Sequence, residues 1–152
     1  MEARVSKDSS PRRLSAPRDP ERTRAAILEA ATAEFTAKGL TGARVDEIAR
    51  RSGMNKRMIY HYFGDKEGLY LAVLEAAYSG IRSAERGLEL ADKDPVECIR
   101  ELVLFTWRYF LDHPEFLSLL GTENLHRAAY LKKSKKIRDL HSPLVGMISA
   151  LL

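Results

Sequence analysis

The chain has 152 residues, 45% of them hydrophobic and 30% charged, with a single cysteine, Cys98, that excludes an internal disulfide. No apolar run reaches the roughly 18 to 20 residues that span a bilayer, and the N-terminus has no apolar signal-peptide core, so we expect a cytoplasmic protein without a membrane partner. Residues 1–63 hold 13 Lys and Arg against 8 Asp and Glu, whereas residues 64–152 hold 12 against 13. This asymmetry favours a first half that faces nucleic acid, although it would also suit an anionic membrane surface.

Helix-forming residues dominate the chain, Gly and Pro are sparse, and strand-like alternation is hard to find, so we predict an all-α fold. Residues 1–19 are rich in Ser, Pro and Arg and are predicted to form a disordered basic arm. Arg12, Arg13 and Arg18 in this arm could follow a DNA backbone or enter a minor groove. A solvated tail with general electrostatic attraction would explain them equally well.

The first helix is predicted to begin at Asp19 and Pro20, because a capping residue followed by proline is typical of a helix start. It should end at Lys38, since Gly39 is a stop signal. Its apolar residues recur on one face and comprise Ile27, Leu28, Ala31 and Phe35. We expect this stripe to close a three-helix head with the two helices that follow.

Two short helices joined by a tight turn are predicted next, at Val45–Ser52 and Lys56–Phe63. The first has a buried face at the i, i+3, i+4 spacing of a helix. Gly53 can take the left-handed conformation that ends a helix, and Asn55 is a good N-cap for the next one. A turn of about three residues between two such helices is typical of a helix-turn-helix, whose second helix lies in the DNA major groove.

The second of these helices has two different faces. Ile59 and Phe63 are four residues apart and would pack inward against Ile48. The side chains expected to point outward are Lys56, Arg57, Met58, Tyr60 and His61. Recognition helices contact bases through their N-terminal residues, Lys and Arg pair with guanine acceptors, and Tyr and His reach phosphates or base edges. The alternative is a core helix with a solvated cationic face.

The run from Val45 to Tyr70, VDEIARRSGMNKRMIYHYFGDKEGLY, closely resembles the DNA-binding domain of the tetracycline-repressor (TetR) family of bacterial transcription regulators. The residues in register, with Gly39 before them, are Ile48, Ala49, Gly53, Tyr60, Phe63, Lys66 and Leu69. The resemblance is strong over about residues 22 to 75. It implies a dimeric, ligand-responsive regulator, more often a repressor, that occupies a palindromic operator in double-stranded DNA.

The resemblance also implies individual DNA contacts. In TetR relatives the start of the first helix touches phosphate, which implicates Arg22, and Lys66 resembles a phosphate-contacting lysine beside a helix N-terminus. The full predicted DNA-binding set is Arg22, Arg44, Asn55, Lys56, Arg57, Met58, Tyr60, His61 and Lys66. Arg44 stands where the family usually has a capping Thr or Ser, and Arg57 and Met58 replace small or hydroxyl residues. The operator sequence therefore cannot be transferred from a relative.

After the motif we predict a long helix from Lys66 to about Gly87, which would span roughly 33 Å. A polar break follows, and Asp94 with Pro95 then marks a strong helix start. Residues 96–112 form a helix that is apolar on nearly all sides. We expect it to be the central helix of a second domain.

Two further helices complete the pattern. A short apolar helix is predicted around residues 116–120, and an amphipathic one around residues 137–151, which Pro143 should kink or start. The final ISALL lies inside that last helix with no stop signal, whereas family members usually continue for two more helices that build the dimer interface. We therefore expect either a chain that is incomplete at its C-terminus or an oligomer that uses another surface. An apolar face left exposed would favour association or aggregation.

We divide the chain into the arm at residues 1–19, a helix-turn-helix DNA-binding domain at residues 20–65, and a helical regulatory domain at residues 66–152. In the family the second domain is a helical bundle that holds a small-molecule effector and the dimer interface. The candidate effector contacts are Trp107, Phe110, Phe116 and Leu120 as walls, with Glu123, Asn124, His126 and Arg127 as polar groups. Aromatic residues at helical spacing are more often simply core.

An enzyme is the second class of protein to consider. The four histidines, His61, His113, His126 and His141, show no metal-ligand spacing, and there is no phosphate-cradling glycine loop. We expect neither catalysis nor a bound metal or cofactor. A third class is a non-catalytic basic module that binds nucleic acid or an anionic surface without sequence specificity. It would differ from a regulator by ignoring the sequence of the duplex.

Overall fold

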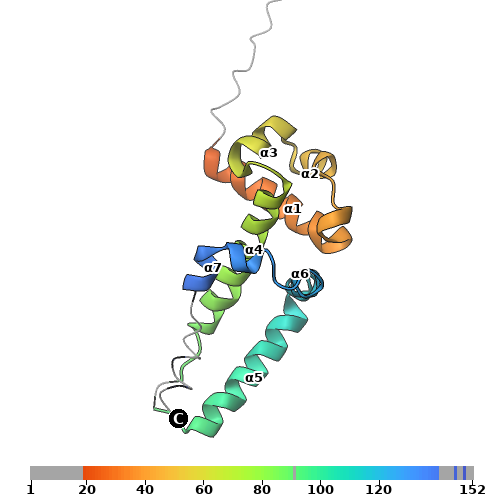
Figure 1. Cartoon of the computed structure of the whole chain (residues 1–152). Coiled ribbons are helices and arrows are strands. Elements are labelled where there is room, and N and C mark those ends of the chain that lie inside the picture. The colour runs from red at the N-terminus through yellow and green to blue at the C-terminus, as the bar shows by residue number, and fades with distance from the viewer. Residues whose placement is uncertain (1–18, 91, 141–145, 147–148, 150–152) are drawn as a thin grey trace, which may run out of the picture.

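The computed structural model describes residues 19–90, 92–140, 146 and 149. Its elements are α1 Pro20–Gly42, α2 Val45–Ser52, α3 Lys56–Phe63, α4 Lys66–Glu85, α5 Pro95–Asp112, α6 Pro114–Leu125, the short 3-10 helix η1 Leu131–Lys133, and α7 Lys135–Asp139. No strand occurs among the described residues, which confirms the predicted all-α fold. Figure 1 shows α1, α2 and α3 gathered at one end, with α4 running from them toward the far end of α5.

The first helix begins where the sequence predicts and ends later. The Asp19 carboxylate accepts a hydrogen bond from the Glu21 N–H at 3.1 Å, and Pro20 is the first helical residue. Gly39 does interrupt the helix, with φ of 65° and ψ of −179°. The chain then resumes a helical turn to Gly42, because this turn buries Leu40, which is 7% exposed. The predicted end at Lys38 is therefore wrong by one short turn.

The helix-turn-helix bounds, Val45–Ser52 and Lys56–Phe63, are confirmed. Gly53 has the left-handed conformation with φ of 68°, and the Asn55 side chain accepts a hydrogen bond from the Met58 N–H at 2.8 Å. Ile48 and Ile59 are 0% and 1% exposed and lie in one core with residues of α1 and α4. This shared core fixes α3 relative to α2.

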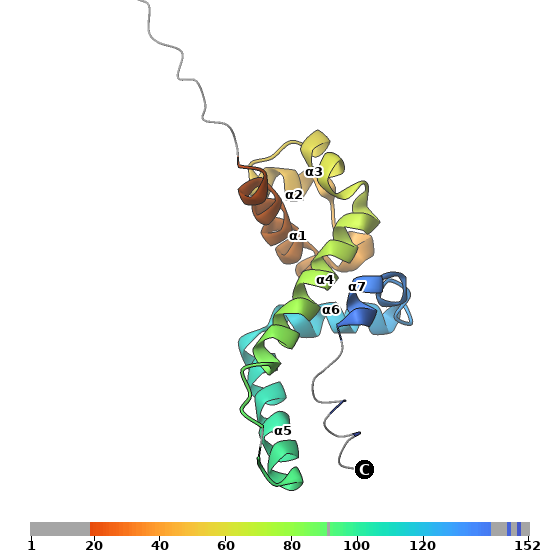
Figure 2. The same cartoon turned by 90° about the vertical axis from the view of Figure 1, so that its left-hand side faces the viewer.

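The fourth helix joins the head to the rest of the molecule. The Tyr70 ring on α4 packs against Phe35 of α1 with centroids 5.1 Å apart, and against Tyr130 beyond α6 at 5.3 Å. Helix α6 also packs directly on α1. Figure 2 shows α4 passing beside α6 and α7 on its way from the head to α5. The predicted end of α4 near Gly87 is two residues later than its observed end at Glu85.

One side of α5 is open in the described part of the chain. Cys98 is the buried residue of this helix, whereas Trp107 and Leu111 are each 63% exposed. The prediction that this helix is the centre of the second domain is therefore wrong for the described residues. Residues 1–18 of the arm predicted at residues 1–19 lie outside the described residues, as does most of the helix predicted at residues 137–151, including Pro143.

Candidate DNA-binding interface

The nine predicted DNA-binding residues all belong to the head or its border with α4. Those classed as exposed are Arg22, Arg44, Asn55, Lys56, Arg57, Tyr60 and His61, while Met58 and Lys66 are partly buried. Ile59, on the opposite side of α3, is 1% exposed. The buried Ile59 therefore anchors α3 and leaves its cations accessible.

The structure brings Lys56 and Arg44 together through a carboxylate on α2. The Asp46 carboxylate lies 2.8 Å from the Lys56 Nζ and 3.8 Å from an Arg44 guanidinium nitrogen. The hydrogen bond from Lys56 holds the pKa of Asp46 below its ordinary value, and Asp46 in turn raises the pKa of Lys56. In the described part of the chain no side-chain hydrogen bond or ion pair joins Arg22 to this group.

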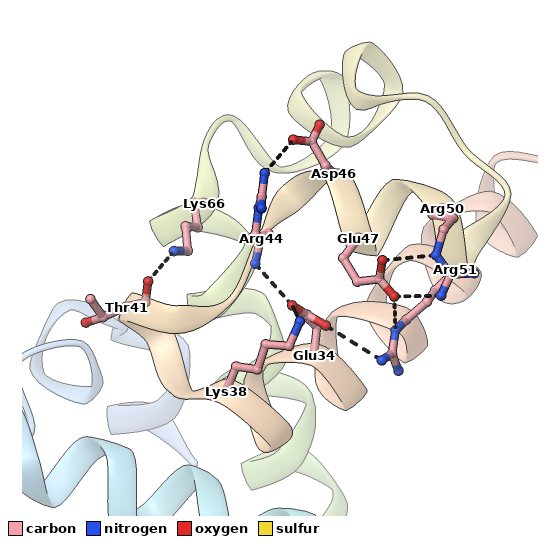
Figure 3. A network of polar contacts seen from close by, with 9 residues as sticks. All are labelled: Glu34, Lys38, Thr41, Arg44, Asp46, Glu47, Arg50, Arg51 and Lys66. Carbon is pink, nitrogen blue, oxygen red and sulfur yellow. Dashed lines mark hydrogen bonds and ion pairs between the residues drawn. The ribbon is translucent and has the colours of Figure 1, made fainter.

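Two more of the predicted contacts, besides Lys56 and Arg44, already have partners within the protein. The Asn55 oxygen caps α3, so its first role is to start the recognition helix. The Lys66 Nζ, at the first position of α4, donates to the Thr41 carbonyl oxygen at 3.4 Å (Figure 3). This long contact joins α4 to the last turn of α1 and leaves the ammonium with two further donors.

A buried carboxylate holds the start of α2, as Figure 3 shows. Glu34 of α1 is 0% exposed and accepts a hydrogen bond from the Arg44 backbone N–H at 3.2 Å. Its carboxylate also lies 2.9 Å from the Lys38 Nζ and 3.8 Å from an Arg51 guanidinium nitrogen. Because Arg44 gives α2 no side-chain cap, Glu34 satisfies one of the donors at that helix start from across the head.

The charge of Glu34 is stabilised by these neighbours. Burial alone would raise the pKa of Glu34, but hydrogen bonds from Lys38 and the Arg44 N–H, with the charges of Lys38 and Arg51, outweigh burial and lower the pKa. The carboxylate therefore stays ionised at neutral pH. It links α1 to both ends of α2.

Glu47 carries a second ion-pair cluster on α2. Its carboxylate lies 2.6 Å from an Arg50 nitrogen and 3.0 Å from the Arg51 Nε. The hydrogen bond from Arg50, followed by that from Arg51, lowers the pKa of Glu47 to about 2. These arginines are therefore partly neutralised within the helix and are less available to phosphate than Arg57.

The lowered pKa of Glu47 predicts an acid-dependent loss of stability. A folded-state pKa of about 2, below the ordinary 4.5, means that the contribution is present above pH 4.5 and is lost as the pH falls toward 2. In thermal unfolding followed by circular dichroism, Glu47→Gln should show a smaller drop in Tm between pH 7 and pH 3 than the parent protein. Glu29→Gln, which removes an exposed carboxylate of α1, should keep the parent's pH dependence. Equal pH dependence in Glu47→Gln and the parent would contradict the assignment.

A cavity of about 220 Å³ lies where the head meets the other helices. Its walls come from α1, α4, α5 and α6 and comprise Thr32, Val73, Ala76, Ala77, Gly80, Tyr109, Glu115, Phe116 and Leu119. Phe116 is the predicted effector contact among them. Because the walls include α1 and α4, a molecule in this cavity would contact the head and the second domain at once.

The other predicted effector contacts are spread over several places. Phe110 stacks on Phe116 with centroids 5.9 Å apart and shares with Trp107 a surface depression of about 280 Å³. Glu123 is 1% exposed and accepts a hydrogen bond from the Leu131 N–H at 3.0 Å. Leu120, Asn124, His126 and Arg127 do not line this depression or the cavity. The structure thus places Phe110 and Phe116 together and leaves the polar candidates outside the cavity.

Tyr109 is the residue of this region that the sequence prediction missed. It lines the cavity of about 220 Å³ and a wider surface groove of about 480 Å³ beside Leu88 and α5. It lies two positions after Trp107, which is roughly 200° around a helix. The two aromatics therefore face different sides, and the pattern alone could not tell which side meets α4.

Within the described ranges, no three His, Cys, Asp or Glu residues are grouped so that they could hold a metal ion. None of the helices described there has both the length and the apolar character that a bilayer crossing requires. What the geometry does provide is a three-helix head with an exposed cationic α3 and a helical extension. This arrangement defines a helix-turn-helix protein with an attached helical domain.

Comparisons with known proteins give the family. Residues 27–73 match the family described as bacterial regulatory proteins, tetR family, and residues 95–152 match the tetracyclin repressor-like C-terminal domain. The chain belongs to the tetR family of bacterial regulatory proteins. This confirms the resemblance seen between Val45 and Tyr70.

Two curated relatives are similar over most of this chain. The HTH-type transcriptional repressor NicS of Pseudomonas putida is 43% identical over 132 residues, which cover 87% of this chain and 62% of NicS. The HTH-type transcriptional repressor SCO4008 of Streptomyces coelicolor is 38% identical over 141 residues, which cover 82% of this chain and 67% of that protein. The chain thus spans about two thirds of the length of these relatives.

Solved structures agree on the fold. HlyIIR, a hemolysin II transcriptional regulator, superposes with a TM-score of 0.63 at 27% identity, covering 80% of this chain and 66% of HlyIIR. The transcriptional regulator SCO4942 from Streptomyces coelicolor gives a TM-score of 0.60 at 30% identity, covering 77% of this chain and 64% of that one.

Proposed function

We propose that this protein is a DNA-binding transcriptional repressor that reads its operator with α3. The observation that carries the proposal is the exposed start of α3, where Lys56 and Arg57 follow an Asn55 cap while Ile59 is buried beneath them. Recognition helices use their N-terminal residues in this way. Two similar proteins, NicS and SCO4008, are named transcriptional repressors.

The proposed contacts divide into two groups. Base edges are contacted by residues of α3, namely Lys56, Arg57, Met58, Tyr60 and His61. The DNA backbone is contacted from the starts of α1, α2 and α4 by Arg22, Arg44 and Lys66. Phosphate contacts position a protein on the duplex, and base contacts specify the sequence. We place the boundary between the DNA-binding and regulatory domains at residues 65 and 66, where α4 begins.

This division predicts two different outcomes for two lysine variants. Lys56→Ala should cost about 1–3 kcal/mol of operator affinity and relax specificity, because it removes a base contact. Lys66→Ala should weaken all duplexes alike and lower the salt slope by about one. Fluorescence anisotropy with operator and scrambled duplexes over a salt series measures both. An altered base preference in Lys66→Ala would contradict the assigned roles.

We further propose that the protein acts as a homodimer on a palindromic operator. Two recognition helices of a two-fold dimer must lie about 34–36 Å apart to reach successive major grooves. Selection of bound duplexes from a random pool, with the solution mass measured alongside, tests both points. A palindromic consensus with a dimeric mass is the expected result. No enrichment of any sequence would overturn the proposed function and favour a basic module without specificity.

We propose that a small-molecule effector releases the protein from DNA. The cavity between α1, α4, α5 and α6 supports this, because a ligand against Phe116 and Tyr109 would also contact Thr32 on α1 of the head and Val73 on α4. The protein would then regulate transcription by binding DNA and the effector, without catalysing a reaction. We place it in the cytoplasm, where bacterial DNA lies. A broad compound screen in which nothing changes operator affinity by even a few fold would remove the support for an effector.

A further inference from the structure

Asp46 is the second residue of α2 and reaches out of its own helix to α3. Its Oδ1 lies 2.8 Å from the Lys56 Nζ, and its Oδ2 lies 3.8 Å from an Arg44 guanidinium nitrogen. The side chain is 59% exposed, and those of Arg44 and Lys56 are 74% and 48% exposed. A negative charge therefore lies on the accessible surface of the head between two cations that we assign to the DNA.

This ion pair is not needed to form the motif. Helix α3 already begins with the Asn55 cap and is held by the buried Ile59. Helix α2 has a second first-turn carboxylate, Glu47, which pairs with arginines of α2 itself and so supports the helix locally. Exposed ion pairs add little to stability. The main effect of Asp46 is thus to hold the Lys56 ammonium in one position and to limit how readily that ammonium moves away to another partner.

A carboxylate at this place changes binding to DNA in two ways. It repels phosphate oxygens, and it gives Lys56 a partner that must be exchanged before the ammonium can pair with the duplex. Specificity is a difference between two affinities, and a repulsive group can increase that difference by weakening binding to wrong partners. Lysine pairs with the O6 and N7 acceptors of guanine, and such contacts discriminate against other bases.

We propose that Asp46 is a specificity-determining residue, which holds Lys56 and Arg44 back from arbitrary phosphates and releases Lys56 only where a base edge accepts its hydrogen bonds. The inference rests on the proposed function of α3 as the reading helix. It adds to that function a residue that lowers affinity for DNA in general and so raises the preference for the operator.

The test is Asp46→Asn, which keeps the size of the side chain and removes its charge. Binding to a scrambled duplex should tighten at least threefold at low salt, and its salt slope should steepen by about one, as expected for one additional phosphate contact. Affinity for the selected consensus duplex should change less, so the ratio of the two affinities should fall. Anisotropy titrations on duplexes of equal length at several salt concentrations give both numbers.

Two further variants separate this role from a structural one. Glu97→Gln removes a matched first-turn carboxylate on α5, where Glu97 lies 3.9 Å from Arg100, and should leave the affinity ratio unchanged. In a Lys56→Ala background, Asp46→Asn should lower the ratio less than it does in the parent, because the lysine through which Asp46 acts is gone. Thermal unfolding of each variant shows whether the head is intact.

Three results would overturn the inference. An unchanged or higher ratio in Asp46→Asn means that the carboxylate does not oppose general binding. Equal weakening of both duplexes means that Asp46 only supports α2. An equal fall of the ratio with and without Lys56 means that Asp46 does not act through that residue. If the parent protein itself prefers no duplex, the proposed function fails, and the role of Asp46 fails with it.

Discussion

Gly68→Ala should destabilise the head by about 1–3 kcal/mol or more and weaken operator binding at least tenfold. Phe63 is the last residue of α3, and a Cβ on Gly68 would lie 2.1 Å from its carbonyl oxygen. The atom in the way belongs to the backbone and cannot rotate aside, so α3 or the start of α4 must move. Urea unfolding and operator titrations measure the two effects.

The matched control is Gly121→Ala on α6. A Cβ at Gly121 meets no atom within 4 Å, and the residue is exposed. Glycine inside a helix is normally less favourable than alanine by about 0.5–1 kcal/mol, so this variant should be stabilised by that amount. Stabilisation of both variants would contradict the close approach of α3 and α4.

The close approach at Gly68 fixes the start of α4 against the end of α3. The Asp65 carboxylate caps α4 by accepting a hydrogen bond from the Gly68 N–H at 2.7 Å, and Gly64 has φ of 82° at the end of α3. The connection between α3 and α4 is therefore only two residues long and tightly packed. If a ligand moved the start of α4, α3 would have to move with it.

Local signals were sufficient for the helix-turn-helix. Gly53, Asn55 and Asp65 set the ends and starts of helices through their own backbone and capping preferences, so the bounds of α2 and α3 could be predicted from a few neighbouring residues. At Gly39 the local signal predicts a stop, and the backbone does leave the helical conformation there, although α1 continues beyond it. The local signal could not give the extra turn to Gly42, because that turn depends on burying Leu40 in a core built from distant residues.

The sequence pattern could not predict which side chains of separate helices contact each other. Asp46 and Lys56 are ten residues apart, on different helices, and nothing in their spacing shows that they meet. On α5, apolar side chains on nearly all sides give no indication of which side packs. The sequence predicts Trp107 as a pocket wall, whereas in the structure it is 63% exposed and lines a surface depression, not the cavity beside α4. A signal did exist for Glu34, since it interrupts the buried stripe of Ala31 and Phe35. A carboxylate at such a position needs donors from another element.

Glu34→Ala is the second variant for which we expect a large effect, a loss of about 1–3 kcal/mol in the free energy of unfolding. The substitution leaves the Arg44 backbone N–H without its acceptor and deprives Lys38 and Arg51 of their shared partner. Both cations are partly exposed and can turn to water, which limits the cost. Urea unfolding followed by circular dichroism measures it, and Glu29→Ala, at an exposed position of the same helix, is the control.

The conservative variant Glu34→Gln distinguishes the hydrogen bond from the charge. Its amide oxygen can still accept from the Arg44 N–H, but the amide no longer attracts Lys38 and Arg51, so we expect an intermediate loss. Because the pKa of Glu34 is lowered in the folded state, the charge contribution is present above the ordinary pKa of 4.5 and disappears as the pH falls through the folded-state value. The difference between the parent and Glu34→Gln should therefore shrink in acid. If Glu34→Ala unfolds like Glu29→Ala, the start of α2 is held by the apolar core alone, and the carboxylate has no part in setting the angle of the recognition helix.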